Sequence, residues 1–509
     1  MPRNSKSADI STTRLARRTR LKMPVIGMES EFNVWLDEVE IVPEKYWKHP
    51  RNFIDAPLLK REKTSSHIPT GGAVYFDRGV IEVVTPVIEL APHATARMVR
   101  SLWEQIQFVR DQLTRWEGVN GHTVRLKAYS SHYNISYEIP KRLQNAHRNE
   151  KKLALLLAYI LPVPVMLAGG NRRSTGVGVR PRGRRIEVTV DFTPDPGLMI
   201  ATAALIVGIV RAVMEWPSYE LSMLEKMPVP VIAGVVPGKH TTRKGWLTKD
   251  FHYPQSPYTS DIDEPMWDTQ FGEKKSLRQI GKDVAWHFRT SIRRHSDPFS
   301  VRLLFAILDG RAASMLELAD RPAAYEDVGR LCQWGIVIDE LRHFGEAAPV
   351  VEEYRHERQQ VREQHLSEIA KPQPRLHAKS MRPSLPPVMP IPVVAAPVLR
   401  QQKRSRLLEG YIDRRGTTLL ATTPKRERRR KAERRRSRYS IPFPDRRLTR
   451  SAYEQVFLKL VSGGRLRVGN DLYTPVGMKG WYHAIFRNAS GEERLLTIDQ
   501  LLSKMNDWT

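Results

Sequence analysis

The sequence predicts an α+β fold with a small second α+β domain at the C-terminal end. Three observations predict it. Short segments in which apolar and polar residues alternate, at 25–35, 73–84 and 185–192, are typical of strands. Residues 102–116 repeat apolar side chains in steps of four and three, which is typical of a helix. A proline-rich segment at 372–397 separates this part of the chain from a second apolar region.

Composition and charge limit the class of protein. The chain has 509 residues, of which 41% are hydrophobic, enough for a sizeable core. Its 82 Lys and Arg against 55 Asp and Glu give a formal net charge of +27, which favours phosphate-rich or acidic partners. Residues 401–450 alone hold 18 basic and 5 acidic side chains. The one cysteine, Cys332, excludes an internal disulfide framework and a cysteine-built zinc site.

We expect neither a secretory signal nor a membrane span. Residues 1–22 are basic and lack an apolar core, so they are predicted to form a flexible tail. Of two apolar runs, 153–170 is interrupted by prolines. The other, 198–210, is shorter than the roughly 20 residues that a spanning helix needs. Both runs are predicted to lie in the core, and a cytoplasmic location is expected.

Each element follows from its local pattern. Charged residues are set into an apolar strand at 25–35, and two short β segments flank Asp77-Arg78-Gly79. The helix over 102–116 is predicted to end at Gly118 and Gly121. A β stretch is predicted on both sides of His132, at 124–130 and 133–139. Further helices are predicted over 153–161 (stopped by Pro162 and Pro164), 198–214 and parts of 270–345.

Composition divides the chain into four parts. After the basic tail, residues 23–345 are predicted to form the catalytic domain. Residues 346–440 hold a charged helix, a linker with eight prolines in 26 residues, and an Arg-rich segment. Residues 441–509 are predicted to form a small α+β domain of β-like pieces and a short helix at 498–504.

Two carboxylates lie two positions apart in the first strand. Period-two geometry directs Glu29 and Glu31 to the same face of a sheet. Two like charges so placed repel each other unless a positive group lies beside them, and Mg²⁺ is the usual solution because hard cations prefer carboxylate oxygens. The alternative is an exposed polar strand face.

Other charged groups also occur inside β-like stretches. They are Glu82 in VIEVVTP, Glu89 seven residues later, His132 in YSSHYNIS and Glu187 in RRIEVTV. Burying any one of them without a partner would be costly. A common face that binds metal and phosphate would explain the set, whereas each residue alone fits a surface or a satisfied core position.

Arginines supply the opposite charge. Arg172, Arg173, Arg184 and Arg185 flank the Gly-rich stretch TGVGVRPRG. Guanidinium groups match the oxygens of phosphate and carboxylate. The glycines do not form a Walker loop, and a solvated basic hairpin is the alternative interpretation.

The order of these motifs resembles the glutamine synthetase-like carboxylate–amine ligases over residues 24–215. The order is GMESEF, an acid near TP, a β-embedded His, and RIEV followed by an apolar helix. GGAVYFDRGVIEVVTP and SSHYNISYE are most similar to the Pup ligase and depupylase branch, although Val87 stands where that branch has an acid. The resemblance implies a curved antiparallel sheet backed by helices.

The resemblance also implies roles for individual residues. Asp77 would be the catalytic aspartate that takes a proton from an attacking amine, or from water in a hydrolase. Arg185 would lie near the transferred phosphate, with Arg173 or Arg184 as substitutes in binding the nucleotide. The ligands of Mg²⁺, some acting through ATP, would be Glu29, Glu31, Glu82, His132 and Glu187.

The activity so implied is ATP- and Mg²⁺-dependent formation of an amide or isopeptide bond. Transfer of the γ-phosphate of ATP would turn a carboxylate into an acyl phosphate, which an amine then attacks. The carboxylate could belong to the C-terminus or a side chain of a small protein modifier, and the amine to a protein lysine. An amidase or isopeptidase on the same fold remains an alternative.

A nucleic-acid-binding protein is the alternative from a different class. The run 425–438 holds ten Lys and Arg in fourteen residues and would bind phosphate backbones or acidic proteins without sequence specificity. Because no helix-turn-helix, zinc finger or RNP signature accompanies this run, an accessory binding property is favoured over nucleic-acid binding as the main function, which stays an alternative.

Overall fold

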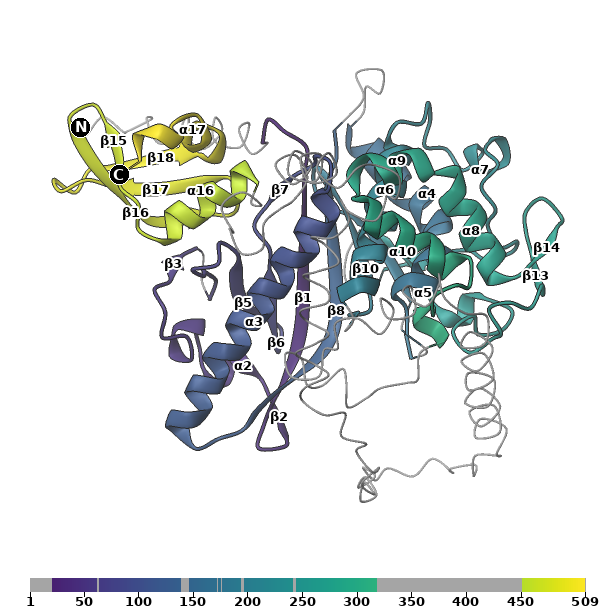
Figure 1. The fold of residues 1–509 in the computed structure, drawn as a ribbon, viewed down its shortest axis with the longest axis horizontal. Helices are drawn as coiled ribbons and strands as arrows, with labels where there is room; N and C mark the ends of the chain where they lie inside the picture. Colours follow the sequence, from purple (N-terminus) through teal and green to yellow (C-terminus); the bar gives the residue numbers. More distant parts are fainter. Residues whose placement is uncertain are drawn as a thin grey trace, which may run out of the picture. The chain divides into compact units, whose positions relative to one another are not determined.

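A computed structural model of the protein describes residues 21–61, 64–138, 146–171, 173–174, 176–193, 196–240, 244–317 and 451–508. The predicted segments at 346–440, including 425–438, lie outside these ranges, as do residues 1–20. The described part is a mixed structure built on a twelve-stranded antiparallel sheet with packed helices (Figure 1). The prediction of a mainly antiparallel sheet packed against helices is confirmed.

The sheet has a long central strand with partners on both sides. The order along its main path is β11-β12-β9-β10-β8-β1-β6-β5-β4-β3, and β2 and β7 pair with β1. The strands that matter below are β1 (Val25–Leu36), β5 (Ala73–Asp77), β6 (Val80–Val84), β8 (Val124–Ser136), β9 (Val177–Pro181) and β10 (Arg185–Val190). The others are β2 (Val39–Ile41), β3 (Leu59–Lys60), β4 (Ser66–His67), β7 (Ile88–Glu89), β11 (Gly238–Lys239) and β12 (Trp246–Thr248).

Two tight hairpins set the register of this sheet. Asp77 pairs with Val80, so Arg78 and Gly79 form a two-residue loop in which both φ angles are positive, at 53° and 97°. A loop of that kind matches the twist of the strands that it joins. Gly183 and Arg184 likewise have positive φ angles between β9 and β10. The register places residues that are far apart in the sequence opposite one another.

The β stretch around His132 is one strand and not two. β8 runs without a break from Val124 to Ser136 and pairs with β1 on one side and β10 on the other. The prediction of β structure on both sides of His132 is confirmed, and His132 itself belongs to the strand. The register shifts between Glu31 and Phe32, so a β-bulge lies next to the polar residues.

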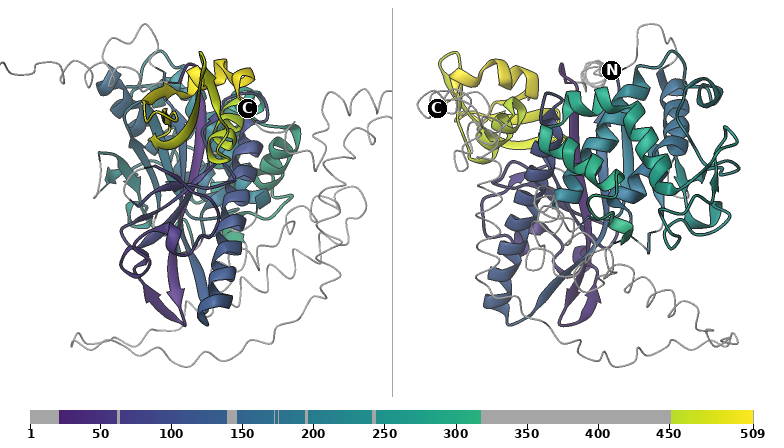
Figure 2. Two further views of the ribbon diagram at one scale, coloured as in Figure 1. Left: turned by 90° about the vertical axis from the view of Figure 1, so that its left-hand side faces the viewer. Right: turned by 45° about the vertical axis from the view of Figure 1, so that its right-hand side comes forward.

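The predicted long helix is present and packs on the sheet. α3 (Ala94–Asn120) ends at Gly121, whose φ of 70° allows the left-handed C-cap. Its buried positions include Leu102, Ile106 and Val109. Figure 2 shows α3 running along the long strands. Its apolar face therefore covers one side of the sheet, as the spacing of these residues predicts.

The chain stays helical across the two prolines near residue 162. α4 (Ala146–Ile160) is followed directly by α5 (Pro162–Gly169), at an angle of 61°. The predicted stop before the prolines is confirmed, because α4 ends at Ile160, but a second helix that was not predicted begins directly afterwards. Pro162 occupies the first turn of a new helix, where a missing N–H costs nothing.

One described helix is long and apolar enough to cross a membrane. It is α6 (Pro196–Met214), which is longer than the run 198–210 suggested. Most of the helix is buried inside the protein, in contact with α3, α5, α9 and α10. This burial is what a core helix of the domain requires.

The remaining helices of the large domain follow α6. They are α7 (Met223–Lys226), α8 (Leu277–His287), α9 (Arg289–His295) and α10 (Pro298–Leu308). A short helix, α2 (Pro43–Tyr46), lies between β2 and β3 in the sequence. Three of them confirm the helices predicted within 270–345, of which residues after 317 lie outside the described ranges. A two-stranded ribbon, β13 (Trp267–Asp268) with β14 (Lys274–Lys275), lies beside them.

Residues 451–508 form a four-stranded sheet with two helices. The strands are β15 (Leu466–Val468), β16 (Asp471–Lys479), β17 (His483–Arg487) and β18 (Glu493–Thr497), followed by α17 (Ile498–Ser503). All were predicted. α16 (Ala452–Val461) was not, although Ser451 and Glu454 form a capping box at its start.

His67 lies at the contact between this C-terminal module and the large sheet. Its ring stacks on Phe457, with centroids 5.7 Å apart, and meets Trp481 edge-on at 4.7 Å. Its Nδ1–H donates to the Gly72 carbonyl at 3.2 Å. Burial, together with the nearby charge of Arg61, lowers the pKa of His67 to about 3. The packing therefore requires a neutral imidazole.

Gly208→Ala should destabilise the protein, because α6 and α9 touch at this glycine. A Cβ at Gly208 would lie 2.7 Å from the Ile292 Cα, too close for van der Waals contact. We expect a loss of about 1–3 kcal/mol in the free energy of unfolding by urea. The control is Gly118→Ala on the open face of α3, where a Cβ meets nothing within 4 Å. It should gain about 0.5–1 kcal/mol, and equal effects of the two variants would contradict the close approach.

Acidification should weaken the packing around His67. The unfolded state binds a proton near pH 6.5 and the folded state only near pH 3, so stability is full above pH 6.5 and falls with pH through this window. Between pH 6.5 and 5 the loss is about 2 kcal/mol by linkage. Urea unfolding at several pH values measures it. His67→Phe keeps a ring without a titrating group, so an unchanged pH slope in this variant would show that His67 is not the source.

Candidate active site

Alternation along the strands gives the large sheet one polar and one apolar face. Residues opposite one another in neighbouring antiparallel strands share a face. The registers place Tyr75, Asp77, Glu82, Glu29, Glu31, Ser130, His132, Asn134, Arg185, Glu187, Thr189 and Arg180 on the polar face. The other face carries Ile26, Met28, Phe32, Ile81, Val83, Tyr133, Ile135, Ile186 and Val188, all buried.

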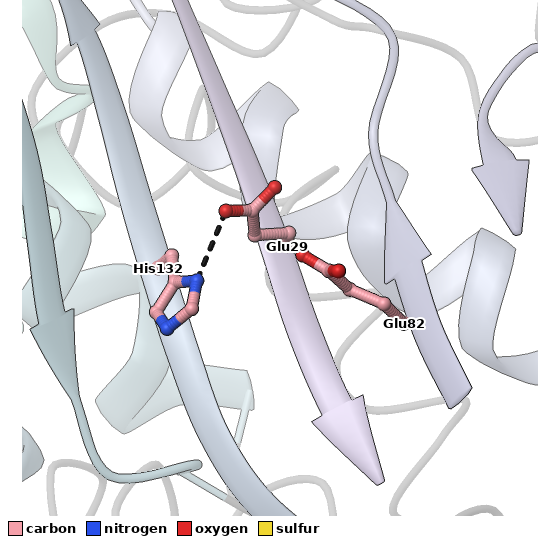
Figure 3. Close-up of side chains that lie close together, drawn as sticks. All are labelled: Glu29, Glu82 and His132. Atoms are coloured by element: carbon pink, nitrogen blue, oxygen red, sulfur yellow. Dashed lines mark hydrogen bonds and ion pairs between the residues drawn. The ribbon is translucent and has the colours of Figure 1, made fainter. Parts of the chain in front are cut away.

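Glu29 and His132 form a buried pair across β1 and β8. They are directly opposite in the register, and the His132 Nδ1–H donates to Glu29 Oε1 at 2.9 Å (Figure 3). Burial opposes the charge on Glu29, but the bond to His132, its charge and that of Arg185 hold the pKa of Glu29 at about 2. Burial likewise opposes the charge on His132, yet Glu29 and further carboxylates raise its pKa. Each partner therefore favours the charged form of the other.

Glu82 is buried beside this pair, and among the described residues no basic side chain forms an ion pair with it. It is 4% exposed and lies opposite Glu31 on β1 and Tyr75 on β5. Burial and the charges of Glu29 and Glu31 raise the pKa of Glu82 well above its ordinary value. Its carboxyl hydrogen-bonds both Tyr75 and Glu29. A bound cation would reverse this shift, because it would stabilise the ionised form.

Glu29, Glu82 and His132 form a group that could hold a metal ion. One ligand atom from each lies within 4.8 Å of the others, and all three side chains are buried (Figure 3). Two carboxylates and one imidazole suit a divalent cation. The structure therefore brings together three of the five residues that the sequence analysis proposed as ligands.

Glu31 lies next to this trio and is joined to it by Ser130. The Ser130 hydroxyl donates to Glu31 Oε2 at 2.6 Å and lies 3.3 Å from His132 Nε2. Glu31 Oε1 is 4.0 Å from the same nitrogen. Ser130 therefore bridges Glu31 and His132. Glu31 is thus positioned at the rim of the trio.

Asp77 shares the polar face and stands at the end of β5. It is two positions from Tyr75, which pairs with Glu82. Glu44 accepts a hydrogen bond at 2.8 Å from the backbone N–H of Gly79, so the hairpin that follows Asp77 is held in place. Asp77 is half-buried.

Glu187 is surrounded by arginines and stands apart from the trio. Its carboxylate is fully buried and forms ion pairs with Arg180 on the adjacent strand and with Arg182, the latter at 3.0 Å. Arg180 is itself 5% exposed. A buried carboxylate between two guanidinium groups is well compensated. In this structure Glu187 therefore holds Arg180 and Arg182 in position.

The three arginines proposed to bind phosphate differ in placement. Arg185 lies on the polar face, and its charge acts on Glu29. Arg184 is exposed in the β9–β10 hairpin, and its carbonyl accepts a hydrogen bond from the Tyr137 N–H at 2.8 Å. Arg173 is exposed in the connection between α5 and β9. Arg185 alone of the three is on the sheet.

Glu89 lies near the C-terminal module, where it accepts a bond from the Tyr453 N–H at 2.8 Å.

Sequence reasoning missed several members of the polar face. They are Tyr75, Ser130, Asn134, Arg180 and Arg182. A signal was present for Tyr75, Ser130, Asn134 and Arg182. Each of these residues lies two positions from a proposed site residue in the same strand or hairpin. Period two alone could have identified them as neighbours of Asp77, His132 and each other.

Comparison with known proteins gives a distant likeness to a solved structure. No family model matches the chain, and no curated protein matches it. A solved structure, the crystal structure of the complex between Prokaryotic Ubiquitin-like Protein Pup and its Ligase PafA, has a TM-score of 0.39 and 11% sequence identity. The match covers 95% of this chain and 92% of that chain. These values support only a distant relationship of fold.

Glu82→Gln should remove divalent-cation binding without harming the fold. The amide keeps hydrogen bonds to Tyr75 and Glu29 while one of three close carboxylates loses its charge. Because the pKa of Glu82 is raised, its ionisation costs stability as pH increases, so the variant should unfold at the same or a higher temperature at pH 8. Saturating Mg²⁺ or Mn²⁺ at 100 times Kd should stabilise wild type by about 2.7 kcal/mol and leave the variant unchanged.

The matched control is Glu225→Gln on exposed α7, which should respond to the cations as wild type does. An equal thermal shift in Glu82→Gln and wild type would show that the trio is not a cation site. Thermal unfolding monitored by circular dichroism provides both measurements.

Proposed function

We propose that this chain is an ATP- and Mg²⁺-dependent ligase that joins a carboxylate to an amine. The observation that carries the proposal is the gathering of Glu29, Glu82 and His132, with Glu31 at the rim, on one face of an antiparallel sheet. Such a group has no role in packing, since apolar side chains on the opposite face form the core.

The charge on the polar face changes sign across the strands. Glu82, Glu29 and Glu31 occupy β6 and β1, whereas Arg180 and Arg185 occupy β9 and β10. His132 on β8 lies between the two zones. A nucleotide with bound cations carries both kinds of charge, with cations that need carboxylates and phosphate oxygens that need guanidinium groups. The arrangement of the face supports such a ligand.

The residues present fit a magnesium ion. Glu82 is poorly compensated, and the trio offers two carboxylates and an imidazole, with Glu31 close by. Magnesium held there would neutralise charge on transferred phosphate groups. Ser130 would keep Glu31 in position, and Tyr75 would keep Glu82 in position.

Asp77 and Arg185 are the protein groups proposed to act on the substrates. Arg185 would stabilise the negative charge of the phosphoryl group as it moves from ATP to the substrate carboxylate. The amine then attacks the carbonyl carbon, phosphate leaves, and Asp77 accepts the proton that the amine loses. General-base help of this kind contributes typically about 10²–10⁴-fold to a rate.

The substrates follow from the sequence resemblance alone. We propose a carboxylate on a small protein modifier, a protein lysine as the amine, and a cytoplasmic location. The arginine-rich run 425–438 would add binding of acidic protein or nucleic acid. Amide hydrolysis by the same Asp77 is the competing activity, and the ATP requirement separates the two.

The first test is binding of MgATP followed by turnover in an Asp77→Asn variant. Isothermal titration should show MgATP binding to wild type, binding to Asp77→Asn within about threefold of it, and no binding to Glu82→Gln. With a panel of carboxylates and amines, ADP release by Asp77→Asn should be lower by about 10²-fold or more, because the amine keeps its proton.

Asp111→Asn on the exposed side of α3 is the control for Asp77→Asn and should behave as wild type. Undiminished MgATP binding by Glu82→Gln would contradict the proposed metal site. Amide cleavage without ADP release would replace the ligase with the amidase. Absence of MgATP binding by wild type would refute both the site and the reaction.

A further inference from the structure

Arg61 is a cation at the contact between the C-terminal module and the large sheet, and nothing above gives it a role in the site. It follows β3 directly, and its backbone N–H donates to the Ser65 carbonyl at 3.1 Å. One terminal nitrogen of its guanidinium donates to the Ser65 hydroxyl at 3.3 Å. Within the described part of the chain no carboxylate forms an ion pair with Arg61. The main contacts of its guanidinium group are aromatic rings.

The guanidinium of Arg61 lies over two rings that belong to different parts of the protein. Its Cζ is 4.9 Å from the centroid of the Trp481 ring and 5.7 Å from that of Tyr75. Both distances are within the roughly 6 Å at which a cation interacts with an aromatic face. Trp481 lies in the turn between β16 and β17 of the C-terminal module, and Tyr75 lies on β5. Arg61 therefore joins the C-terminal module to the polar face of the large sheet.

Trp481 is held in place by rings other than those it shares with Arg61. It meets the His67 ring edge-on, with centroids 4.7 Å apart, and the Phe457 ring edge-on at 5.1 Å. Phe457 belongs to α16 and is fully buried. Because rings from both the module and the large sheet hold Trp481, it offers Arg61 a fixed surface.

Tyr75 carries this contact into the proposed cation site. It lies opposite Glu82 in the register of β5 and β6, and its hydroxyl donates a hydrogen bond to the Glu82 carboxyl. Glu82 is one of the three residues that could hold a metal ion. A change in the orientation of the Tyr75 ring would move the hydroxyl away from that carboxyl. The position of the ring therefore determines how Glu82 is held.

Direct attraction for a cation does not explain Arg61. Burial and the nearby glutamates raise the pKa of Tyr75, whereas the charge of Arg61 lowers it, so this charge acts on the polar face. A positive charge there would by itself repel a cation bound by Glu82. Any help from Arg61 must therefore come through the position of Tyr75. A planar guanidinium suits this task, because it stacks on aromatic faces in a way that a lysine ammonium does not.

We propose that Arg61 is a positioning residue through which Trp481 of the C-terminal module holds Tyr75, and with it Glu82, in the arrangement that binds a divalent cation. The inference rests on the proposed function for the identity of the site as a cation site. The contact between the three side chains Trp481, Arg61 and Tyr75 stands on the distances themselves. It makes the affinity of the site depend on a module that contributes no ligand.

The first test measures the Kd for Mn²⁺ by electron paramagnetic resonance, in variants that keep the net charge. Arg61→Lys and Trp481→Leu should each weaken Mn²⁺ binding by about three- to tenfold. Trp481→Phe keeps an aromatic face and should lose less than about twofold. The matched control is Arg289→Lys, because Arg289 of α9 also stacks on a tryptophan, Trp286 of α8, at 4.6 Å. It should bind Mn²⁺ as wild type does.

Double variants show whether Arg61 acts through its two neighbours. Adding Arg61→Lys to Tyr75→Phe, or to Trp481→Leu, should weaken Mn²⁺ binding no further than the larger single loss. Urea unfolding without any cation provides a second measurement. The increase in the unfolding constant for Arg61→Lys with Trp481→Leu should be smaller than the product of the single increases by about twofold or more.

Two results would overturn the proposal. One is an unchanged Kd for Mn²⁺ in both Arg61→Lys and Trp481→Leu, which would leave these residues with a structural role alone. The other is a fully additive loss of affinity when Arg61→Lys is combined with Tyr75→Phe, which would show that Arg61 does not act through Tyr75. Failure of wild type to bind Mn²⁺ would refute the cation site and this role together. The unfolding cycle would still decide whether Arg61 links the module to the sheet.

Discussion

Negative charge concentrated in one row of a β-sheet is the constraint on which the rest of this site depends. Neighbouring strands lie about 4.8 Å apart, so carboxylates opposite one another cannot all ionise without a positive group between them. Glu29 is satisfied by His132, and Glu187 by Arg180 and Arg182. Glu82 has only neutral or acidic partners among those described, and the raised pKa records that deficit. A divalent cation is the simplest group that would supply the missing charge.

The fold can hold this concentration of negative charge because the two faces of the sheet have different roles. One face is apolar and packs against helices such as α3, so the stability of the domain comes from that side. The polar face does not have to supply the hydrophobic core, so it can hold charged side chains that would destabilise a core. The β-bulge beside Glu31 and the tight hairpin after Asp77 adjust the aim of individual side chains without disturbing the apolar side.

The sequence predicted the elements better than it predicted their partners. Strand alternation and the spacing of Leu102 and Ile106 are local signals, and both gave the correct element. α16 also had a local signal, the capping box at Ser451, but this helix was not predicted. Membership of the polar face by Ser130 or Asn134 depends on the register between distant strands. Register is a long-range property that no window of residues contains.

The contrast between Glu82 and Glu187 shows what register decides. Both are glutamates in short β-branched strands of the same sheet, and both are buried on the same face. Glu187 lies opposite Arg180, and Glu82 lies opposite Glu31. A shift of one residue would turn each side chain to the other face. The pairing alone therefore makes one glutamate an organiser of arginines and leaves the other in need of a cation, and this difference divides the polar face into an acidic and a basic half.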